Sequence, residues 1–352
     1  MSLYSPEDNL IMNIYGYTLD ELKEYFSSIG ENPAKAKLVF SGIYKNRIND
    51  FREFCFAERI TARLETDFSF SLPEVVQKTE CADAAKLLLK LSDGEFVETV
   101  LMRQRFGNCV CVSTQIGCNM GCAFCQSGLM KKRRDLELSE IAGQVLCVSK
   151  EFSCGIDGVS VMGIGEPFDN FENVCRFCDL ISDDNGLAIG RRHITVSTCG
   201  VVPKIREFAE RERSYSLAIS LHAPNDKLRS EIMPINRRYP ISEIIKAAEY
   251  YSEKTHKRVT LEYILLGGFN DSSEHAVQLA ELIGGRDLYV NLIPYNATDC
   301  GFRKSDDGKL SEFCGILKEH GVIATKRREF GAELKAACGQ LTSEQLTINS
   351  KQ

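Results

Sequence analysis

The sequence predicts an α/β fold, namely a partial (β/α) barrel preceded by a small helical region. From residue 108 onward, apolar or alternating segments follow one another with amphipathic helical stretches between them. A strand–helix repeat of this kind produces parallel strands joined by helical crossovers. The repeat covers about 200 residues, which is short for a closed eight-unit barrel of about 250 residues. A partial barrel is therefore preferred over a doubly wound sheet.

The individual elements follow from the periodicity of the apolar residues. Seven segments have strand character: 108–114, 157–164, 193–198, 214–220, 259–266, 287–293 and 321–327. Five segments have the apolar period of helices: 136–152, 172–181, 241–254, 274–283 and 309–320. No low-complexity tract or linker interrupts this repeat.

The chain before the repeat is predicted to be helical and then to form a β-hairpin. Thr18 and Glu21 have the spacing of a capping box, and Asn32–Pro33 opens a second apolar-periodic stretch. A third short helix is expected over 57–65. The segment 84–102 resembles a hairpin that turns at Asp93–Gly94. We expect a helical accessory domain over 1–75, a hairpin extension over 76–105, a core over 106–341 and a tail over 342–352.

Composition excludes several classes of protein. The 352 residues are 43% hydrophobic and 26% charged, which is typical of a globular protein and not of a disordered one. The apolar runs are far shorter than the ~20 residues that span a bilayer, and the N-terminus lacks the pattern of a signal peptide. Fifteen cysteines, an odd number, indicate a reducing compartment where thiols bind metals or react. We expect a cytoplasmic protein that makes no contact with a membrane.

Glycine, proline and polar residues follow five successive strands of the predicted repeat. These segments are GIGEPFDN, STCG, SLHAPND, LLGGFND and NLIPYN. Each one alone could be an ordinary turn. Because α/β barrels build their active sites at the carboxyl ends of the strands, five such segments in register predict a common site there.

Three cysteines lie within eight residues of one another after the first strand, at Cys118, Cys122 and Cys125. Zinc would need a fourth protein ligand and usually uses two separate pairs of ligands. Three closely spaced thiolates suit a 4Fe-4S cluster in which one iron keeps an open coordination position. The alternatives are a zinc site and three buried cysteines acting as small apolar residues.

The order of these motifs resembles the RlmN/Cfr family of radical S-adenosylmethionine (SAM) RNA adenine methyltransferases, and within it the RlmN branch. The resemblance rests on eight segments in the expected order: VCVSTQIGCNMGCAFC, GIGEPFDN, ITVSTCGVVP, SLHAPND, MPINRRYP, EYILLGGFND, VNLIPYN and FGAELKAACGQL. They run from about residue 98 to 341. The resemblance implies a barrel of the radical SAM type, with the N-terminal helices as an RNA-binding accessory domain.

The resemblance also implies a role for individual residues. The 4Fe-4S cluster would be held by Cys118, Cys122 and Cys125. The positions that match SAM-contacting residues of the family are Gly165, Glu166, Ser197, Ser220, Leu221, His222 and Asn296. Cys338 matches the cysteine that becomes S-methylated, Cys111 matches its resolving partner, and Glu98 falls where the family places a proton acceptor.

The family's chemistry explains why such residues are needed. Carbon 2 of adenine is electrophilic and offers no electron pair for polar methyl transfer. The resemblance implies that Cys338 first takes a methyl group from one SAM, and that a radical generated from a second SAM activates this methyl group for addition to the adenine. Glu98 would then remove a proton, and Cys111 would release the product by forming a transient disulfide bond with Cys338. Cys109 lies on the same strand face, and only the motif distinguishes the two cysteines.

The resemblance implies 23S rRNA and some tRNAs as partners, together with a small electron-donor protein of the flavodoxin or ferredoxin type. Because the net charge is −6, RNA would be held by local basic patches. The basic runs are 131–134, 191–192, 237–238 and 326–328.

Two alternative functions stay open at this point. The first is the Cfr-type enzyme, which methylates carbon 8 and confers antibiotic resistance. Pro167 and the Ile293–Pro294 pair favour the RlmN side. The second is a non-catalytic iron–sulfur or zinc protein that interacts with RNA, and this alternative gives no role to Cys338 or Cys111. The other ten cysteines have no assigned role, and the Cys175–Cys178 pair is expected in a helix core.

Overall fold

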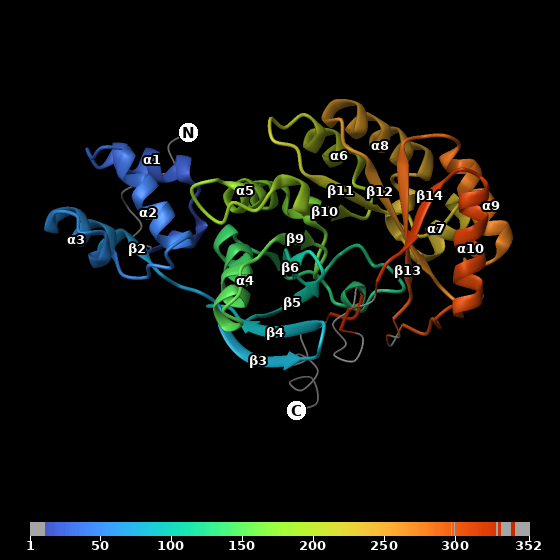
Figure 1. Ribbon diagram of the computed structural model, residues 1–352, viewed down its shortest axis with the longest axis horizontal. Helices are drawn as coiled ribbons and strands as arrows, with labels where there is room; N and C mark the ends of the chain where they lie inside the picture. Colours follow the sequence, from blue (N-terminus) through green and yellow to red (C-terminus); the bar gives the residue numbers. More distant parts are fainter. Residues whose placement is uncertain (1–10, 297, 299, 329, 332–338, 342–352) are drawn as a thin grey trace.

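The computed structural model describes residues 11–296, 298, 300–328, 330–331 and 339–341. Its centre is a ten-stranded sheet with the order β14-β13-β12-β11-β10-β9-β6-β5-β4-β3 (Figure 1). The strands of this sheet are β3 (Glu74–Glu80), β4 (Ala84–Lys90), β5 (Phe96–Gln104), β6 (Gly107–Val112), β9 (Gly158–Val161), β10 (Ile194–Thr198), β11 (Ser216–Ser220), β12 (Val259–Leu265), β13 (Leu288–Pro294) and β14 (Ile323–Lys326).

The parallel part of the sheet confirms the predicted fold class. Strands β6 and β9 to β14 pair in parallel, each with the next one along the chain. This succession is that of a (β/α) barrel, because every crossover moves one strand further in the same direction. The order of the described strands has two ends, so the barrel is partial. Each of the seven segments predicted as strands overlaps one of these strands.

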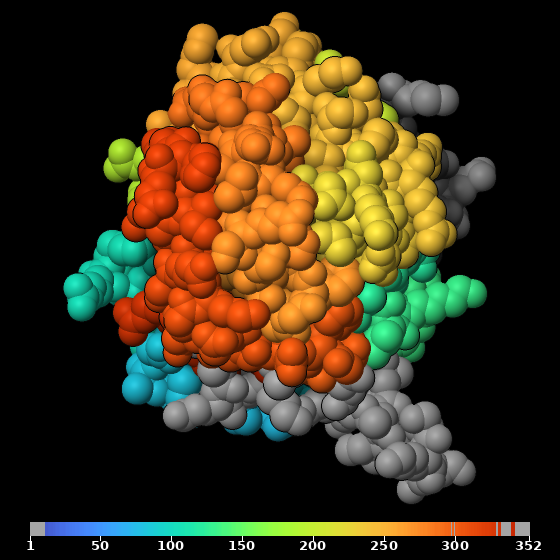
Figure 2. Space-filling model, turned by 90° about the vertical axis from the view of Figure 1, so that its right-hand side faces the viewer, coloured from blue at the N-terminus to red at the C-terminus, as the bar shows by residue number. Residues whose placement is uncertain are grey.

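Helices cover the outer face of the parallel strands, as Figure 1 shows. They are α4 (Leu138–Glu151), α5 (Phe171–Ser182), α6 (Val202–Ala209), α7 (Asp226–Ile232), α8 (Ile241–Thr255), α9 (Ser273–Ile283) and α10 (Asp307–Glu319). Figure 2 shows that the orange to red part of the chain, which includes α9 and α10, forms a continuous layer on one side of the molecule. The short helices α6 and α7 were not among the predicted elements.

The N-terminal region is helical, as predicted. Its first two helices begin after the residues that the sequence indicated, Thr18 and Asn32–Pro33. It consists of β1 (Met12–Asn13), η1 (Ile14–Gly16), α1 (Leu19–Ser28), α2 (Ala34–Tyr44), η2 (Phe51–Phe54), α3 (Glu58–Asp67) and β2 (Phe68–Ser69). Thr18 and Glu21 form the capping box of α1. The region lies beside α4 and α5 (Figure 1), and Arg176 of α5 forms an ion pair of 2.7 Å with Glu21.

The predicted hairpin exists and belongs to the main sheet. Strands β4 and β5 pair in an antiparallel manner on either side of Asp93–Gly94. Strand β3, which the sequence did not identify, adds a third antiparallel strand, and β5 pairs with β6 on its other side. The extension therefore continues the barrel sheet, and the domain boundaries given above stay a prediction.

Short elements fill the connections between the strands and helices, most of them at the carboxyl ends of the strands. They are β7 (Gln115–Ile116), η3 (Gln126–Leu129), β8 (Arg134–Asp135), η4 (Pro167–Asn170), η5 (Arg191–His193) and η6 (Pro234–Arg237). Of these, η5 precedes β10 and therefore lies at the opposite edge of the sheet from the others. None of the helices in the described residues is long and apolar enough to span a bilayer.

Candidate active site

A loop that carries three cysteines leaves the sheet after β6. We call residues 117–130 the cysteine loop. The amide of Cys118 donates to the carbonyl of Met130 at 2.9 Å, which closes the loop at its base. At Gly117, φ is +76°, and a Cβ atom would lie 2.3 Å from the carbonyl oxygen of Lys131. Glycine is needed there because other residues would clash with this backbone.

The three thiols of the loop lie near one another in a partly buried setting. Cys122 and Cys125 pack against the apolar cluster that contains Phe124, and all three cysteines of the loop are half-buried. Burial raises the pKa of Cys118 to about 12 and also raises the pKa values of Cys122 and Cys125. No group of three or more His, Cys, Asp or Glu side chains in the described residues converges on a single metal ion. A multi-iron cluster distributes its cysteine ligands over separate irons, and this donor set fits such a cluster.

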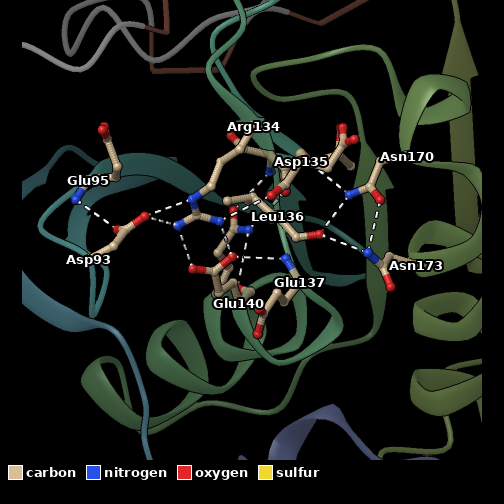
Figure 3. A network of polar contacts seen from close by, with 12 residues as sticks. Asp93, Glu95, Arg134, Asp135, Leu136, Glu137, Glu140, Asn170 and Asn173 are labelled. Atoms are coloured by element: carbon tan, nitrogen blue, oxygen red, sulfur yellow. Dashed lines mark hydrogen bonds and ion pairs between the residues drawn. The ribbon is translucent and has the colours of Figure 1, made fainter. Parts of the chain in front are cut away.

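The segment after the cysteine loop is fixed by a network of polar contacts (Figure 3). Arg134 of β8 forms ion pairs of 2.7 Å with Asp93, in the turn of the β4–β5 hairpin, and with Glu140 of α4. Asn170 and Asn173 donate to the carbonyl of Leu136 at 2.7 and 3.2 Å. The loop is therefore anchored to the hairpin and to two helices.

The turn after β9 contains Gly165 and Glu166. At Gly165, φ is +109°, and a Cβ atom would lie 2.6 Å from the side chain of Gln115. Gln115 in turn accepts a hydrogen bond of 2.9 Å from the amide of Glu166. The Glu166 carboxylate is buried and accepts hydrogen bonds from the amides of Phe168 at 3.0 Å and Cys199 at 2.7 Å. Burial raises the pKa of Glu166, and the amide of Cys199 opposes this shift.

The turn after β11 contains Ser220, Leu221 and His222. His222 has φ of +58° and is 5% exposed. Its Nδ1 accepts a hydrogen bond of 3.0 Å from the amide of Ile264, and its ring packs edge-on against Phe124 of the cysteine loop. Burial and the charge of Arg229 lower its pKa to about 3. The imidazole is therefore neutral at physiological pH, and its proton is on Nε2.

These turns form one site at the carboxyl edge of the parallel sheet. Glu166 links the turns after β9 and β10, and His222 links the turn after β11 to the cysteine loop. Ser197 is half-buried on β10, and Asn296 is half-buried two residues beyond the end of β13. The structure thus places all seven predicted SAM-contacting residues on this edge or beside it.

Glu98 and Cys111 lie on one face of the sheet beside this edge. Cys111 of β6 is paired with Val100 of β5. Because side chains alternate along a strand, Glu98 is on the same face as Val100. The Glu98 carboxylate is 1% exposed and lies 2.8 Å from the ammonium group of Lys86 on β4. Cys111 is also buried and packs with Val100, Ile164 and Leu341.

The C-terminal segment reaches both the cysteine loop and this face. The amide of Gln126 donates to the carbonyl of Gly339 at 2.9 Å, and Oγ of Ser127 donates to the carbonyl of Leu341 at 3.0 Å. Leu341 also belongs to the apolar cluster that contains Cys111. Cys338 itself lies outside the described residues, and Gly339 is its neighbour in the sequence.

Three functional candidates of the site were not found from the sequence. Lys86 contacts Glu98, as described above. Arg229 of α7 is fully buried beneath the turns after β10 and β11. Glu262 of β12 is 5% exposed, accepts hydrogen bonds of 3.0 and 3.2 Å from Asn291, and lies 3.7 Å from Arg327. Each is recognised by contacts between residues far apart in the sequence.

The other cysteines are scattered over the fold. Cys175 and Cys178 are fully buried in α5, as expected of a helix core. Burial raises the pKa of Cys109 to about 11, while the charge of Arg327 lowers it. All fourteen described cysteines are free thiols, so a permanent disulfide bond is not supported among them.

Comparison with known families agrees with this arrangement. A family model described as "Radical SAM superfamily" matches residues 112–280, and one described as "Ribosomal RNA large subunit methyltransferase N-terminal domain" matches residues 12–64. The chain is 42% identical over 338 residues to a protein of Thermoanaerobacter pseudethanolicus named "Probable dual-specificity RNA methyltransferase RlmN". That match covers 95% of this chain and 98% of the relative. The chain belongs to the RlmN family.

A second relative and a solved structure extend this finding. The RlmN protein of Lactococcus lactis is 47% identical over 349 residues, with 96% of both chains covered. The crystal structure of a radical SAM methyltransferase from Sphaerobacter thermophilus has a TM-score of 0.89 at 37% identity and covers 94% of this chain and 99% of its own. The chain is therefore an RlmN-type enzyme with the α/β fold of the radical SAM superfamily, which implies a 4Fe-4S cluster and SAM.

Proposed function

We propose that this enzyme methylates carbon 2 of an adenine in 23S rRNA, and in some tRNAs, through an S-methylated cysteine and with two SAM molecules per turnover. One observation carries the proposal more than any other. The C-terminal segment docks on the cysteine loop through Gly339 and Leu341, and Leu341 belongs to the same apolar cluster as Cys111. Cys338 precedes Gly339 in the sequence, and the docking of Gly339 and Leu341 supports its proposed role together with Cys111 and Glu98.

The cysteine loop and the strand ends would hold the cofactors. Cys118, Cys122 and Cys125 supply three thiolates, and burial of their thiols suits metal binding because a metal ion displaces the proton. Gly165, Glu166, Ser197, Ser220, Leu221, His222 and Asn296 would contact SAM. When bound, the cluster and SAM supply one electron, the methyl group and the radical chemistry that activates this group. A flavodoxin or ferredoxin type protein is proposed as the electron donor.

Three residues of the chain carry out the remaining steps, which are methyl uptake, proton removal and product release. The Cys338 thiolate is a nucleophile that takes the methyl group by displacement and carries it as a thioether. After the methyl carbon has bonded to carbon 2, Glu98 accepts the proton that leaves this carbon. The Cys111 thiolate attacks the sulfur of Cys338, forms a disulfide bond and breaks the bond between that sulfur and the methylene carbon. The electron pair of the broken bond stays with the methylene carbon, which takes up a proton and becomes the methyl group of the product. An external thiol must later reduce this disulfide.

Burial of Glu98 suits its proposed task. The ammonium group of Lys86 lies 2.8 Å from the Glu98 carboxylate, and both side chains are buried away from bulk water. Cys111 is on the same face, in the apolar cluster that includes Leu341 of the C-terminal segment. Cys109, two residues earlier on the strand, is not part of this apolar cluster.

Nucleoside mass spectrometry tests the proposal. The cluster-loaded enzyme, incubated anaerobically with SAM, a reductant and either a 23S rRNA fragment or tRNA, is expected to yield 2-methyladenosine. Finding 8-methyladenosine instead would assign the enzyme to the Cfr type. A bound metal without SAM cleavage to 5′-deoxyadenosine would favour a non-catalytic RNA-interaction protein.

A further inference from the structure

Arg229 is the largest charged group enclosed in the described core. It lies on α7 and is 0% exposed. Its guanidinium donates hydrogen bonds to the carbonyls of Leu221 at 3.0 Å, Ser220 at 2.9 Å and Cys199 at 2.6 Å. A fourth bond of 2.9 Å goes to Oδ1 of Asn236. All four acceptors are neutral.

A buried charge of this kind normally has a partner of opposite charge. Transfer of a cation from water to the protein interior is costly, and guanidinium groups in proteins are usually paired with carboxylates. Within the described part of the chain, no carboxylate oxygen lies within ion-pair distance of Arg229. The carboxylate nearest to it in the hydrogen-bond network is that of Asp226, which accepts a bond of 3.0 Å from Asn236 and so is separated from Arg229 by one side chain.

The side of Arg229 that faces the active site is formed by the cysteine loop. The amide of Ala123 donates to the carbonyl of Ile232, at the end of α7, at 2.9 Å. Arg229 donates to the carbonyl of Cys199 at 2.6 Å, and Cys199, Phe124 and Met233 form one apolar cluster against which Cys122 packs. The cysteine loop therefore lies beside the part of the core that holds Arg229.

We propose that Arg229 is a positioning residue whose fixed positive charge raises the reduction potential of the cluster bound by the cysteine loop. The proposal rests on the proposed function, because it requires that cluster. A cluster becomes more negative when it gains an electron, and a nearby cation stabilises the reduced form in a low-dielectric surrounding. The four hydrogen bonds hold the cation in place and tie it to the turns after β10 and β11.

The reduction potential of the cluster is the direct test. Arg229→Gln removes the charge and retains a hydrogen-bond donor. At a fixed solution potential, we expect the ratio of reduced to oxidised cluster to fall about tenfold, which equals a shift of about 59 mV to lower potential for one electron. A unit charge within about 10 Å at an effective dielectric constant of about 20 gives an effect of this order. Arg229→Lys is expected to keep most of the potential while losing thermal stability.

A second pair of variants, at Asn236, tests the same proposal if Arg229→Gln does not fold. Asn236→Asp places a carboxylate against the guanidinium and neutralises its charge without removing it. Asn236→Ala removes the same side-chain hydrogen bonds without adding charge. We expect Asn236→Asp to have the lower potential of the two, and equal potentials would overturn the proposal.

The outcomes separate this inference from the function on which it rests. The potential is followed by electron paramagnetic resonance of the reduced cluster during a titration with a chemical reductant, and cluster content is measured by visible absorption. If the wild-type chain binds no cluster, the proposed function fails. If it binds one and Arg229→Gln keeps the same potential, only the role of Arg229 is wrong. A matching drop in the Lys variant would also contradict a role for charge.

Discussion

The contact between Lys86 and Glu98 has a consequence for the pH dependence of the enzyme. Both side chains are buried and lie 2.8 Å apart. A nearby positive charge favours the ionised form of a buried carboxylate. Lys86→Met removes such a charge and therefore makes Glu98 a poorer proton acceptor.

We expect Lys86→Met to lower turnover at pH 7 at least tenfold, with activity recovering as pH rises. The sign follows because a higher pH returns Glu98 to its ionised form. Turnover is measured as 2-methyladenosine formed per cluster across a pH series, below the unfolding temperature of the variant. Lys90→Met, an exposed lysine on the same strand, is the control. An unchanged pH profile in Lys86→Met would show that the pair has no role in proton transfer.

For single residues, the sequence could predict the functional residues that lie in motifs, but it could not predict which side chains contact them in the fold. Cys118, Cys122 and Cys125 are close in sequence, so their proximity in space could be foreseen. Lys86, Arg229 and Glu262 reach the site only through sheet pairing and helix packing between residues far apart in the sequence. An isolated lysine, arginine or glutamate in a single sequence carries no sign of such burial.

The turn between β9 and η4 shows how one element sets the geometry of the site. Gly165→Ala would place a Cβ atom 2.6 Å from Gln115, at a φ of +109°. Gln115 would have to move, and its hydrogen bond to the amide of Glu166 would weaken. Strain of this kind costs about 1–3 kcal/mol.

We expect Gly165→Ala to lower the melting temperature and to weaken SAM binding at least tenfold. Gly155→Ala is the matched control, because its Cβ would meet no atom within 4 Å and its φ is an ordinary one. Melting is followed by circular dichroism, and SAM affinity by equilibrium dialysis of the cluster-loaded protein. Equal SAM affinity in the two variants would remove Gly165 from the predicted binding site.

Among the elements, the strands were predictable and the short helices were not. The parallel strands are apolar or alternating segments, and the periodicity of their apolar residues is enough to identify them. Helix α7 has seven residues and α6 has eight, and segments this short hold too few turns to show a helical period. Strand β3 was missed because most of its residues are exposed and polar at the edge of the sheet.

For the whole molecule, the structure refines the predicted RNA-binding surface. Three of the four residues in the basic run 131–134 form ion pairs, with Asp135, Glu95, Asp93 and Glu140 as partners. Lys131 is exposed, and no carboxylate pairs with it in the described residues. Its charge is available to phosphate, whereas the charge of Arg134 holds the hairpin to α4.

We therefore expect Lys131→Ala to weaken RNA binding for all sequences and to reduce the salt slope of log K by about 1. Arg134→Ala is expected mainly to lower the melting temperature, because it breaks the network of Figure 3. Filter binding at several salt concentrations measures the first effect. An unchanged affinity and salt slope in Lys131→Ala would exclude this residue from the RNA interface.

Residues from distant parts of the chain meet on the sheet face that carries Glu98. Glu98 lies on β5, Cys111 on β6, and the Gly339–Leu341 segment comes from the far end of the chain. The sequence could predict the barrel and the order of the motifs. It could not show that the hairpin continues the barrel sheet and so carries Glu98 to the face where Cys111 lies.

The central claim is that Cys111 releases a product bound to Cys338, and one measurement tests it most directly. Cys111→Ala and Cys109→Ala, each loaded with cluster, are incubated anaerobically with SAM, a reductant and RNA, and the protein is analysed by denaturing electrophoresis and mass spectrometry. We predict that Cys111→Ala accumulates RNA joined to Cys338 through a methylene group, while Cys109→Ala turns over and releases 2-methyladenosine. Turnover in Cys111→Ala together with an adduct in Cys109→Ala would contradict the account.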